Sequence, residues 1–163
     1  MDDKLVKINI ADYKVSKYPN KLITLGLGSC IGICIYDEKN KIGGIAHIML
    51  PEKPKNRTID EKYYNKYADV AIEAMFNEII KQGGKKDNLV AKIVGGANMF
   101  EKINTSPEDS IGFKNQIVVK KILQKLNIPI IAEELGGNTG RTLILDLKEL
   151  KVSVRSKGEI RDI

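Results

Sequence analysis

Residues 30–50 read CIGICIYDEKNKIGGIAHIML, and this stretch decides the fold. Its two ends, Cys30–Tyr36 and Ile42–Leu50, are mostly apolar, and they flank the polar tip Asp37–Lys41. Two β-rich runs joined by a short polar segment are typical of a β-hairpin. The sequence therefore predicts a hairpin whose second strand ends at Pro51 and Pro54.

Two more strands are expected before the hairpin. Residues Leu5–Ile10 alternate between apolar and polar side chains, and Leu22–Leu27 form a second β-rich run. The polar stretch between them closes with Pro19-Asn20, which is a turn signal. The glycines of Gly26-Leu27-Gly28-Ser29 predict a turn that leads into the hairpin.

Helical spacing begins after the hairpin. Residues Thr58–Glu61 match a capping box, and apolar residues follow at three- and four-residue intervals from Tyr63 to Ile80. Gly83-Gly84 ends this predicted helix. A second helix is expected over residues 113–126.

The remaining apolar runs are short and are interpreted as strands. They are Leu89–Val94, Ile128–Ala132 and a closing hairpin made of Leu143–Leu147 and Val152–Val154. Glycine-rich loops follow the first two of these strands, at residues 95–100 and 136–141.

The order of elements contains no repeat and no long linker. It predicts an α/β protein, a layered sandwich with a mixed, largely antiparallel β-sheet and two main helices. The chain has 163 residues, which fits one domain of ordinary size. Residues 1–163 are therefore expected to form a single domain.

The composition excludes several classes of protein. No run approaches the roughly 18 consecutive apolar residues that span a bilayer, and the N-terminus lacks the apolar core of a signal peptide. A cytoplasmic protein without membrane insertion is expected. One histidine and a single Cys30-x3-Cys34 pair do not make a metal site, so we expect no metal, no cofactor and two free thiols.

The net charge is +6, from 27 Lys+Arg against 21 Asp+Glu. A basic chain can attract acidic partners such as nucleic acid. The lysines are spread along the chain and are not clustered with aromatic residues. This pattern favours a solvated lysine-rich surface over a nucleic-acid interface.

The hairpin also carries the candidate chemistry. If its tip is centred on Glu38 and Lys39, Cys30 lies directly opposite His47, with Cβ atoms roughly 4.5 to 5.5 Å apart. A thiolate–imidazolium pair formed there would lower the thiol pKa, and the imidazolium would serve as general acid. Gly26 and Gly28 allow a bend that presents the sulfur.

The same bend leaves backbone N–H groups available to bind an oxyanion. The amides of Ser29 and Cys30 are the natural candidates. A structural interpretation stands beside this one, because a cysteine on a strand is usually a small buried hydrophobe and a lone histidine is usually a packing residue. An odd-length tip, or a bulge at Gly43-Gly44, would put Cys30 and His47 on opposite faces. Cys34 is interpreted as core.

Several ordered motifs resemble one known family. They are the run Thr24–Cys30, Gly43–Pro51, Lys66–Asp69, Gly95–Phe100, Ile111-Gly112 with Asn115, and Gly136–Arg141. Together they resemble the CheD family, the chemoreceptor glutamine deamidases of chemotaxis. The resemblance covers nearly the whole chain.

This resemblance implies a catalytic set of Cys30 as nucleophile, His47 as base and acid, and Thr24 as the residue that orients the imidazole. From its sequence context, Thr24 is an ordinary strand threonine. The implied substrates are glutamines of methyl-accepting chemotaxis receptors, with receptor methylesterase activity as a side reaction. Gly28, Ser29, Asn98 and Asn138 are candidate oxyanion or substrate-binding residues. Lys114 stands where the family pattern leads us to expect arginine.

A regulatory binding module is the alternative function. The family resemblance implies the CheC phosphatase as a partner, and the chain could act mainly by docking it. The glycine loops around Asn98 and Asn138, with Phe100, would then form the contact surface; these loops are otherwise tight turns. A basic nucleic-acid binder is a third and weaker candidate.

Overall fold

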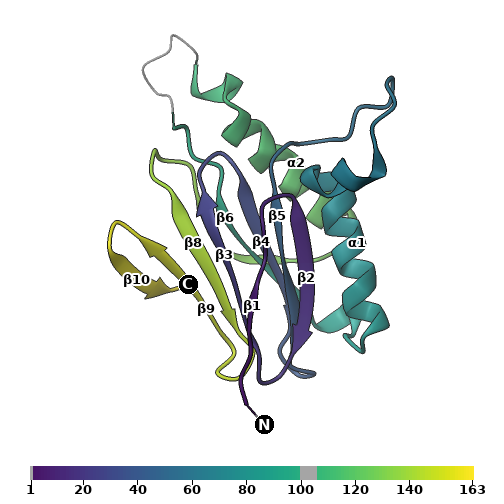
Figure 1. The fold of residues 1–163 in the computed structure, drawn as a ribbon, viewed down its shortest axis with the longest axis vertical. Coiled ribbons are helices and arrows are strands. Elements are labelled where there is room, and N and C mark those ends of the chain that lie inside the picture. Colours follow the sequence, from purple (N-terminus) through teal and green to yellow (C-terminus); the bar gives the residue numbers. More distant parts are fainter. Residues whose placement is uncertain (1, 100–105) are drawn as a thin grey trace.

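The structure is a computed structural model that describes residues 2–99 and 106–163 (Figure 1). Its helices are the α-helices α1 (Ala68–Lys81) and α2 (Ile111–Lys125) and the short 3-10 helices η1 (Glu61–Lys66), η2 (Lys86–Asn88) and η3 (Pro107–Asp109). Its strands are β1 (Leu5–Lys7), β2 (Asp12–Lys17), β3 (Lys21–Leu27), β4 (Ile31–Asp37), β5 (Ile42–Ile48), β6 (Leu89–Gly95), β7 (Ile130–Leu135), β8 (Arg141–Asp146), β9 (Lys151–Ser156) and β10 (Glu159–Asp162).

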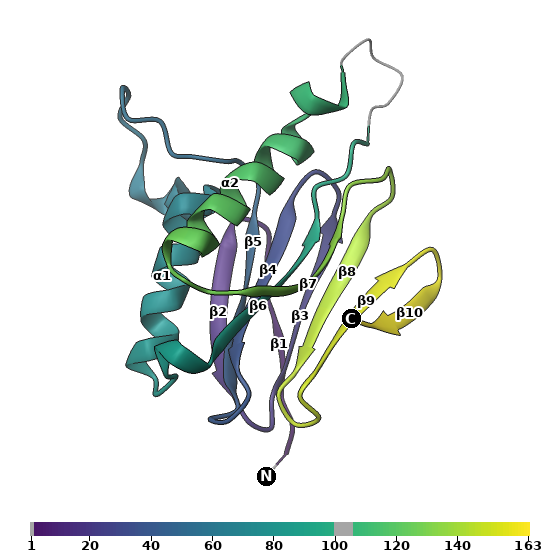
Figure 2. The same cartoon turned by 180° about the vertical axis from the view of Figure 1, so that it is seen from behind.

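The strands form two five-stranded sheets. Sheet A has the order β1-β3-β8-β9-β10, and sheet B has the order β2-β5-β4-β6-β7. Only β1 with β3 and β6 with β7 pair in parallel among the described strands. Figures 1 and 2 show the two sheets face to face, with α1 and α2 covering the outer face of sheet B. The predicted α/β layered sandwich with two main helices is confirmed.

Two cores fill the spaces between these layers. Ile31, Ile33 and Ile35 of β4 belong to the cluster that packs under the helices. Cys34 and Tyr36 of the same strand belong to the cluster between the sheets. Because both faces of β4 are buried, its sequence carries no charged residue before Asp37 at its end.

The hairpin forms, but its predicted register is wrong. Strands β4 and β5 pair Ile31 with Ile48 and Gly32 with His47, so His47 is opposite Gly32 and not opposite Cys30. The tip is centred on Lys39 and Asn40, one residue later than predicted. Asp37 sets this turn, since its carboxylate accepts hydrogen bonds from the Asn40 backbone N–H at 3.0 Å and the Asn40 side chain at 2.7 Å.

The first predicted helix begins too early. The chain forms η1 after Asp60, whose side chain accepts a hydrogen bond from the Lys62 N–H, and the α-helix starts only at Ala68. Tyr67 between them is extended, with φ −96° and ψ 134°. It stays extended because it bridges to Leu50 and because the preceding carbonyl, that of Lys66, accepts backbone hydrogen bonds from Met49 and Leu50.

Other element boundaries also differ from the predicted ones, and two strands were not predicted from the sequence. Helix α2 starts two residues earlier than predicted because the Ser110 hydroxyl caps the Phe113 N–H. Strand β7 starts only after Pro129, and β1 is shorter than Leu5–Ile10. Strand β2 lies in the stretch interpreted as a polar connection, and β10 is exposed at every residue and has no hydrophobic pattern.

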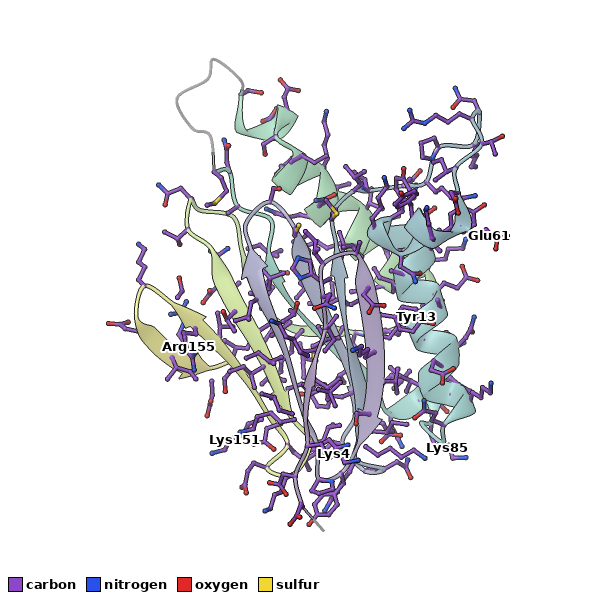
Figure 3. The ribbon with its side chains drawn as sticks, viewed as in Figure 1. Lys4, Tyr13, Glu61, Lys85, Lys151 and Arg155 are labelled. Carbon is purple, nitrogen blue, oxygen red and sulfur yellow. The ribbon has the colours of Figure 1, made fainter. Side chains whose placement is uncertain are left out.

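Charged side chains are spread over the outside of the sandwich. In Figure 3, Lys4 and Lys85 lie near one end, while Lys151 and Arg155 of β9 lie along an edge. No helix among the described residues is long and apolar enough to cross a bilayer.

Candidate active site

His47 joins the two sheets through a hydrogen bond to Thr24. His47 is 2% exposed on β5, and Thr24 is completely buried on β3. The Nδ1 atom of His47 lies 2.7 Å from the Thr24 hydroxyl oxygen. Because β3 belongs to sheet A and β5 to sheet B, the imidazole points into the space between the sheets.

A second hydrogen bond of Thr24 fixes the tautomer of His47. The Thr24 hydroxyl donates to the Ile8 carbonyl at 2.9 Å, and that carbonyl can only accept. The hydroxyl has one hydrogen, so its oxygen accepts from His47, and Nδ1 carries the proton. The Nε2 atom of the neutral ring is then a free base, and it has no hydrogen-bond partner among the described residues.

Cys30 lies one residue before β4, at the entrance to the hairpin. It is a free cysteine, 9% exposed, and belongs to the cluster between the sheets. The β4–β5 ladder stops one residue short of it, at the pair Ile31 and Ile48. The register error was two residues, and a shift of two keeps a side chain on the same face. Cys30 belongs to the cluster between the sheets, on the same side of sheet B as the His47 imidazole.

Burial shifts the pKa values of both groups against the predicted ion pair. Burial raises the pKa of the Cys30 thiol, although the Cys30 backbone N–H opposes this shift by hydrogen bonding to the sulfur. Burial also lowers the pKa of His47 to about 4. The structure has no hydrogen bond between the thiol and Nε2. Such contacts often tighten only when substrate binds.

The backbone before Cys30 is bent by a bulge in β3. The pairing between β3 and β8 shifts between Thr24 and Leu27. Gly26 lies within this bulge with φ +72°, a conformation that favours glycine. The bulge lets Thr24 point inward while the chain turns into the segment that carries Cys30.

The first glycine loop holds the Cys30 segment from the side. The Gly96 N–H donates to the Cys30 carbonyl at 2.9 Å, and the Ala97 N–H donates to the Gly28 carbonyl at 2.9 Å. A Cβ on Gly95 would lie 2.3 Å from the Cys30 carbonyl oxygen. This position has room only for glycine.

The second glycine loop lies against the first. The Asn98 N–H donates to the Gly137 carbonyl, and the Gly136 N–H donates to the Gly95 carbonyl, at 2.9 and 3.0 Å. The structure thus brings the loops of Asn98 and Asn138 to the same end of the sandwich as Cys30. Phe100 lies outside the described residues.

Two residues of the site received no role from the sequence alone. Asn115 of α2 is completely buried and hydrogen-bonds the carbonyls of Ser29 and Met49. Arg141 pairs with Glu134 at 2.8 Å and donates to the Gly95 carbonyl at 3.3 Å. A signal for Asn115 was present, because it is a polar residue within the buried stripe of an amphipathic helix.

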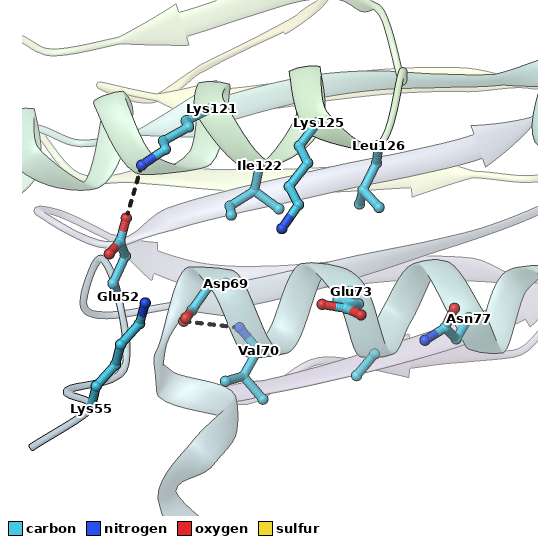
Figure 4. A pocket seen from close by; sticks show the side chains of 11 residues that line it. Glu52, Lys55, Asp69, Val70, Glu73, Asn77, Lys121, Ile122, Lys125 and Leu126 are labelled. Carbon is cyan, nitrogen blue, oxygen red and sulfur yellow. Dashed lines mark hydrogen bonds and ion pairs between the residues drawn. The ribbon is translucent and has the colours of Figure 1, made fainter. Parts of the chain in front are cut away.

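A separate groove lies between α1 and α2, on the helix side of sheet B (Figure 4). Its volume is about 640 Å³, and its lining includes Asp69, Glu73 and Lys125. Glu52 and Lys121, which also line it, form an ion pair at 3.6 Å. Neither Cys30 nor His47 lines this groove. Among the described residues, no group of three His, Cys, Asp or Glu side chains could hold a metal ion.

Comparison with known proteins gives the family. A model described as CheD chemotactic sensory transduction matches residues 49–156. The chain belongs to the CheD family. Proteins named "Probable chemoreceptor glutamine deamidase CheD" from Desulforamulus reducens and Clostridium kluyveri are each 45% identical to it. These matches cover 94% and 97% of this chain, and 91% and 96% of the relatives.

A third relative of the same name, from Clostridium acetobutylicum, is 43% identical over 95% of this chain and 92% of its own length. The predicted CheD resemblance is confirmed. The family model begins two residues after His47, so its match does not include Cys30, His47 or Thr24. Lys114, the departure from the expected CheD pattern, is exposed on α2 beside the buried Asn115.

Proposed function

We propose that this CheD protein is a chemoreceptor glutamine deamidase that uses Cys30 as nucleophile and His47 as base and acid. The observation that carries the proposal is the buried His47 imidazole, whose Nδ1 proton is held by Thr24 and whose Nε2 is free on the side of the sheet that carries Cys30. This is the arrangement that activates a weak nucleophile through an adjacent, oriented base.

In the first step, Nε2 takes the thiol proton as the Cys30 sulfur attacks the carboxamide carbon of a receptor glutamine. Proton transfer during attack suits this site because burial raises the thiol pKa and lowers the pKa of His47 to about 4, so both groups start neutral. The C–N bond of the resulting tetrahedral intermediate then breaks. The imidazolium gives its proton to the departing ammonia, which leaves a thioester on Cys30.

In the second step, water hydrolyses the thioester. Nε2 removes a proton from the water as its oxygen attacks, and the imidazolium returns that proton to the leaving Cys30 sulfur. The products are a receptor glutamate and the free enzyme. Thr24 supports both steps, since it keeps the proton on Nδ1 and leaves Nε2 as the base.

The oxyanion of each tetrahedral intermediate forms beside Cys30. We assign its stabilisation to the backbone amides of Cys30 and Ser29. Both amides are adjacent in the chain to the Cys30 sulfur, so they are within reach of the carbon that it attacks. Gly28, Asn98 and Asn138 form the rim that receives the substrate side chain, because their loops are hydrogen-bonded together around the Cys30 segment.

The proposed substrates are methyl-accepting chemotaxis receptors, encountered in the cytoplasm. This rests on the name of the relatives, chemoreceptor glutamine deamidase. A receptor methyl ester would pass through the same thioester, so methylesterase activity is part of the proposal. No metal or cofactor enters either step.

The test is to incubate the protein with a receptor cytoplasmic fragment and to follow specific glutamines by mass spectrometry. Each deamidation adds about one dalton, because ammonia leaves and water enters. Cys30→Ala should abolish this gain while the protein stays folded. The matched control is Cys34→Ala, since Cys34 is the other buried cysteine and lies in the same cluster. An unchanged rate in Cys30→Ala would remove Cys30 from the mechanism.

Docking of the CheC phosphatase is the second candidate function. Leu25 and Met99 are 45% and 46% exposed, and a Cβ on Gly28 would meet the Met99 side chain at 3.2 Å. Exposed apolar side chains, with Met99 beside the Gly28 backbone, suit a protein contact. If the chain acts mainly by docking, Cys30→Ala retains its effect on CheC and Met99→Glu loses it.

A further inference from the structure

We infer that Asn115 is a positioning residue that sets the placement of Cys30 relative to His47. The inference rests on the proposed function and names a residue that acts through the backbone. Asn115 touches neither side chain of the catalytic pair in any hydrogen bond described; it contacts the chain next to each of them.

One amide group bridges the two segments. The Nδ2 atom of Asn115 donates to the carbonyl of Ser29 and to the carbonyl of Met49, at 3.0 Å each. Ser29 directly precedes Cys30, and Met49 is two residues after His47. Both partners can only accept, so the orientation of the amide is fixed by chemistry and both N–H hydrogens are used.

This bridge stands where strand pairing ends. The next pair of the β4–β5 ladder would be Cys30 with Met49, but the ladder stops at Ile31 with Ile48. The Cys30 carbonyl instead accepts from Gly96, and the Met49 N–H donates to Lys66. The two segments separate at this point, and Asn115 fixes the distance between them.

The neighbouring positions hold α2 against the same backbone. A Cβ on Gly112 would lie 2.5 Å from the Ala97 carbonyl oxygen, so this turn of the helix packs directly on the first glycine loop. Gln116 donates to the Gly96 carbonyl at 2.9 Å. One face of α2 therefore contacts the segments of Cys30, of His47 and of the first glycine loop.

Burying the Asn115 side-chain amide costs desolvation free energy that packing alone does not explain. The Oδ1 atom of Asn115 is buried without a hydrogen-bond partner among the described residues. An apolar residue of similar size would avoid this cost, but it would leave the two carbonyls without a donor. No other side chain of this length places two donors on one atom with no charge.

The experiment is a double-mutant cycle on the reactivity of Cys30 itself. It uses the full chain in a Cys34→Ala background, and it measures the second-order rate of alkylation by iodoacetamide at pH 7. Four proteins are compared in this background: the parent, His47→Ala, Asn115→Leu and the double variant. Leucine removes both donors and adds no charge, so it does not alter the thiol pKa through a new charge.

We expect His47→Ala and Asn115→Leu each to slow alkylation by about 10- to 100-fold, because a base misplaced by about 1 Å loses most of its effect. The double variant should be no slower than His47→Ala alone, since Asn115 acts through the imidazole. The inference is overturned if the two rate reductions multiply in the double variant. It is also overturned if Asn115→Leu is alkylated at the same rate as the parent. Deamidation by Asn115→Leu should show a reduced kcat with little change in KM.

Two controls separate positioning from loss of stability. Ile79→Val removes one buried methyl group at the far end of α1 and should leave the alkylation rate unchanged. If Asn115→Leu does not fold, Asn115→Ser carries the same cycle with a smaller side chain. If the two substitutions are coupled but the protein does not deamidate receptors, the proposed function is rejected and the inference is kept. If the protein deamidates receptors but the two substitutions are not coupled, the inference is rejected and the proposed function is kept.

Discussion

Thr24 determines which nitrogen of His47 is available as a base. Its hydroxyl donates to the Ile8 carbonyl and accepts from Nδ1, and both contacts are buried. No pattern around Thr24 predicts this role, because the hydrogen bond crosses between two sheets and depends on how they pack. The CheD resemblance implied the role; the sequence context alone suggested an ordinary strand threonine.

Thr24→Val keeps the shape of the side chain and removes the hydroxyl. The Nδ1–H of His47 and the Ile8 carbonyl are then buried without partners, which should reduce the free energy of unfolding by about 1–3 kcal/mol. The ring also loses its fixed tautomer, so kcat should fall by about 10-fold or more. Urea unfolding and receptor deamidation measure the two effects. Thr24→Ser, which keeps the hydroxyl, should recover most of both, and equal defects in the two variants would contradict the assignment.

The buried imidazole also predicts a pH dependence of stability. The pKa of His47 is about 4 in the folded protein and about 6.5 in the unfolded chain. Between these values the unfolded chain binds the extra proton, so stability falls as the pH falls from about 6.5 to about 4. The loss from pH 7 to pH 5 should be about 2 kcal/mol.

Urea unfolding at pH 7 and pH 5 measures this loss, and His47→Gln supplies the baseline from all other groups. The loss should be larger in the parent than in the variant. Equal losses would show that His47 titrates normally. Activity should follow the same proton, with kcat/KM retained at pH 6 and falling only as the pH approaches 4.

At the scale of elements, the first glycine loop is the part that a single methyl group should disturb most. Gly95 has φ +119°, and its Cβ would lie 2.3 Å from the Cys30 carbonyl oxygen. Gly83 has nearly the same φ, +115°, with nothing within 4 Å of its Cβ. Substitutions at these two glycines therefore separate the effect of backbone strain from the effect of contact with the Cys30 segment.

Gly95→Ala and Gly83→Ala should both lower the melting temperature, because alanine is strained at these φ values by about 1 kcal/mol. Only Gly95→Ala should also reduce kcat, by about 10-fold or more, because it displaces the Cys30 segment. Thermal unfolding and the deamidation assay test this expectation. Equal kcat values in the two variants would contradict the role of this contact.

Elements with strong periodicity were predicted well, and elements shaped by tertiary contacts were not. The hairpin, α2 and β6 follow from apolar runs bounded by turn residues. The break between η1 and α1 does not, because Tyr67 is held extended by the strand end at Leu50. The hairpin register depends on the Asp37 carboxylate, which accepts a hydrogen bond from the Asn40 N–H. A count of loop residues does not take this hydrogen bond into account.

At the scale of the whole molecule, the two-sheet packing builds the site. Thr24 comes from sheet A, His47 from sheet B, and Cys30 from the connection between them. The sequence placed Cys30 and His47 on one face although the register was off by two, because a shift of two residues conserves the face. The lowered thiol pKa was wrong because burial, which the hairpin alone does not reveal, dominates at Cys30.

The contribution of α2 also appears only at this scale. The sequence marks Gly112 and Asn115 as parts of a CheD-like motif, but it does not show what either residue or Gln116 contacts. In the folded chain they contact the Ser29 and Met49 carbonyls and the first glycine loop. A helix on the outer face of one sheet thereby contacts the segments that carry the candidate catalytic residues.

The most direct measurement of the central claim is the capture of the acyl-enzyme. The protein is mixed with a glutamine-containing receptor peptide, quenched in acid within one turnover, and analysed by intact mass and peptide mapping. The account predicts an adduct on Cys30 whose mass is that of the peptide less about 17 Da, the ammonia lost on forming the thioester. Deamidated peptide that accumulates with no adduct on Cys30, and at the same rate in Cys30→Ala, would contradict it.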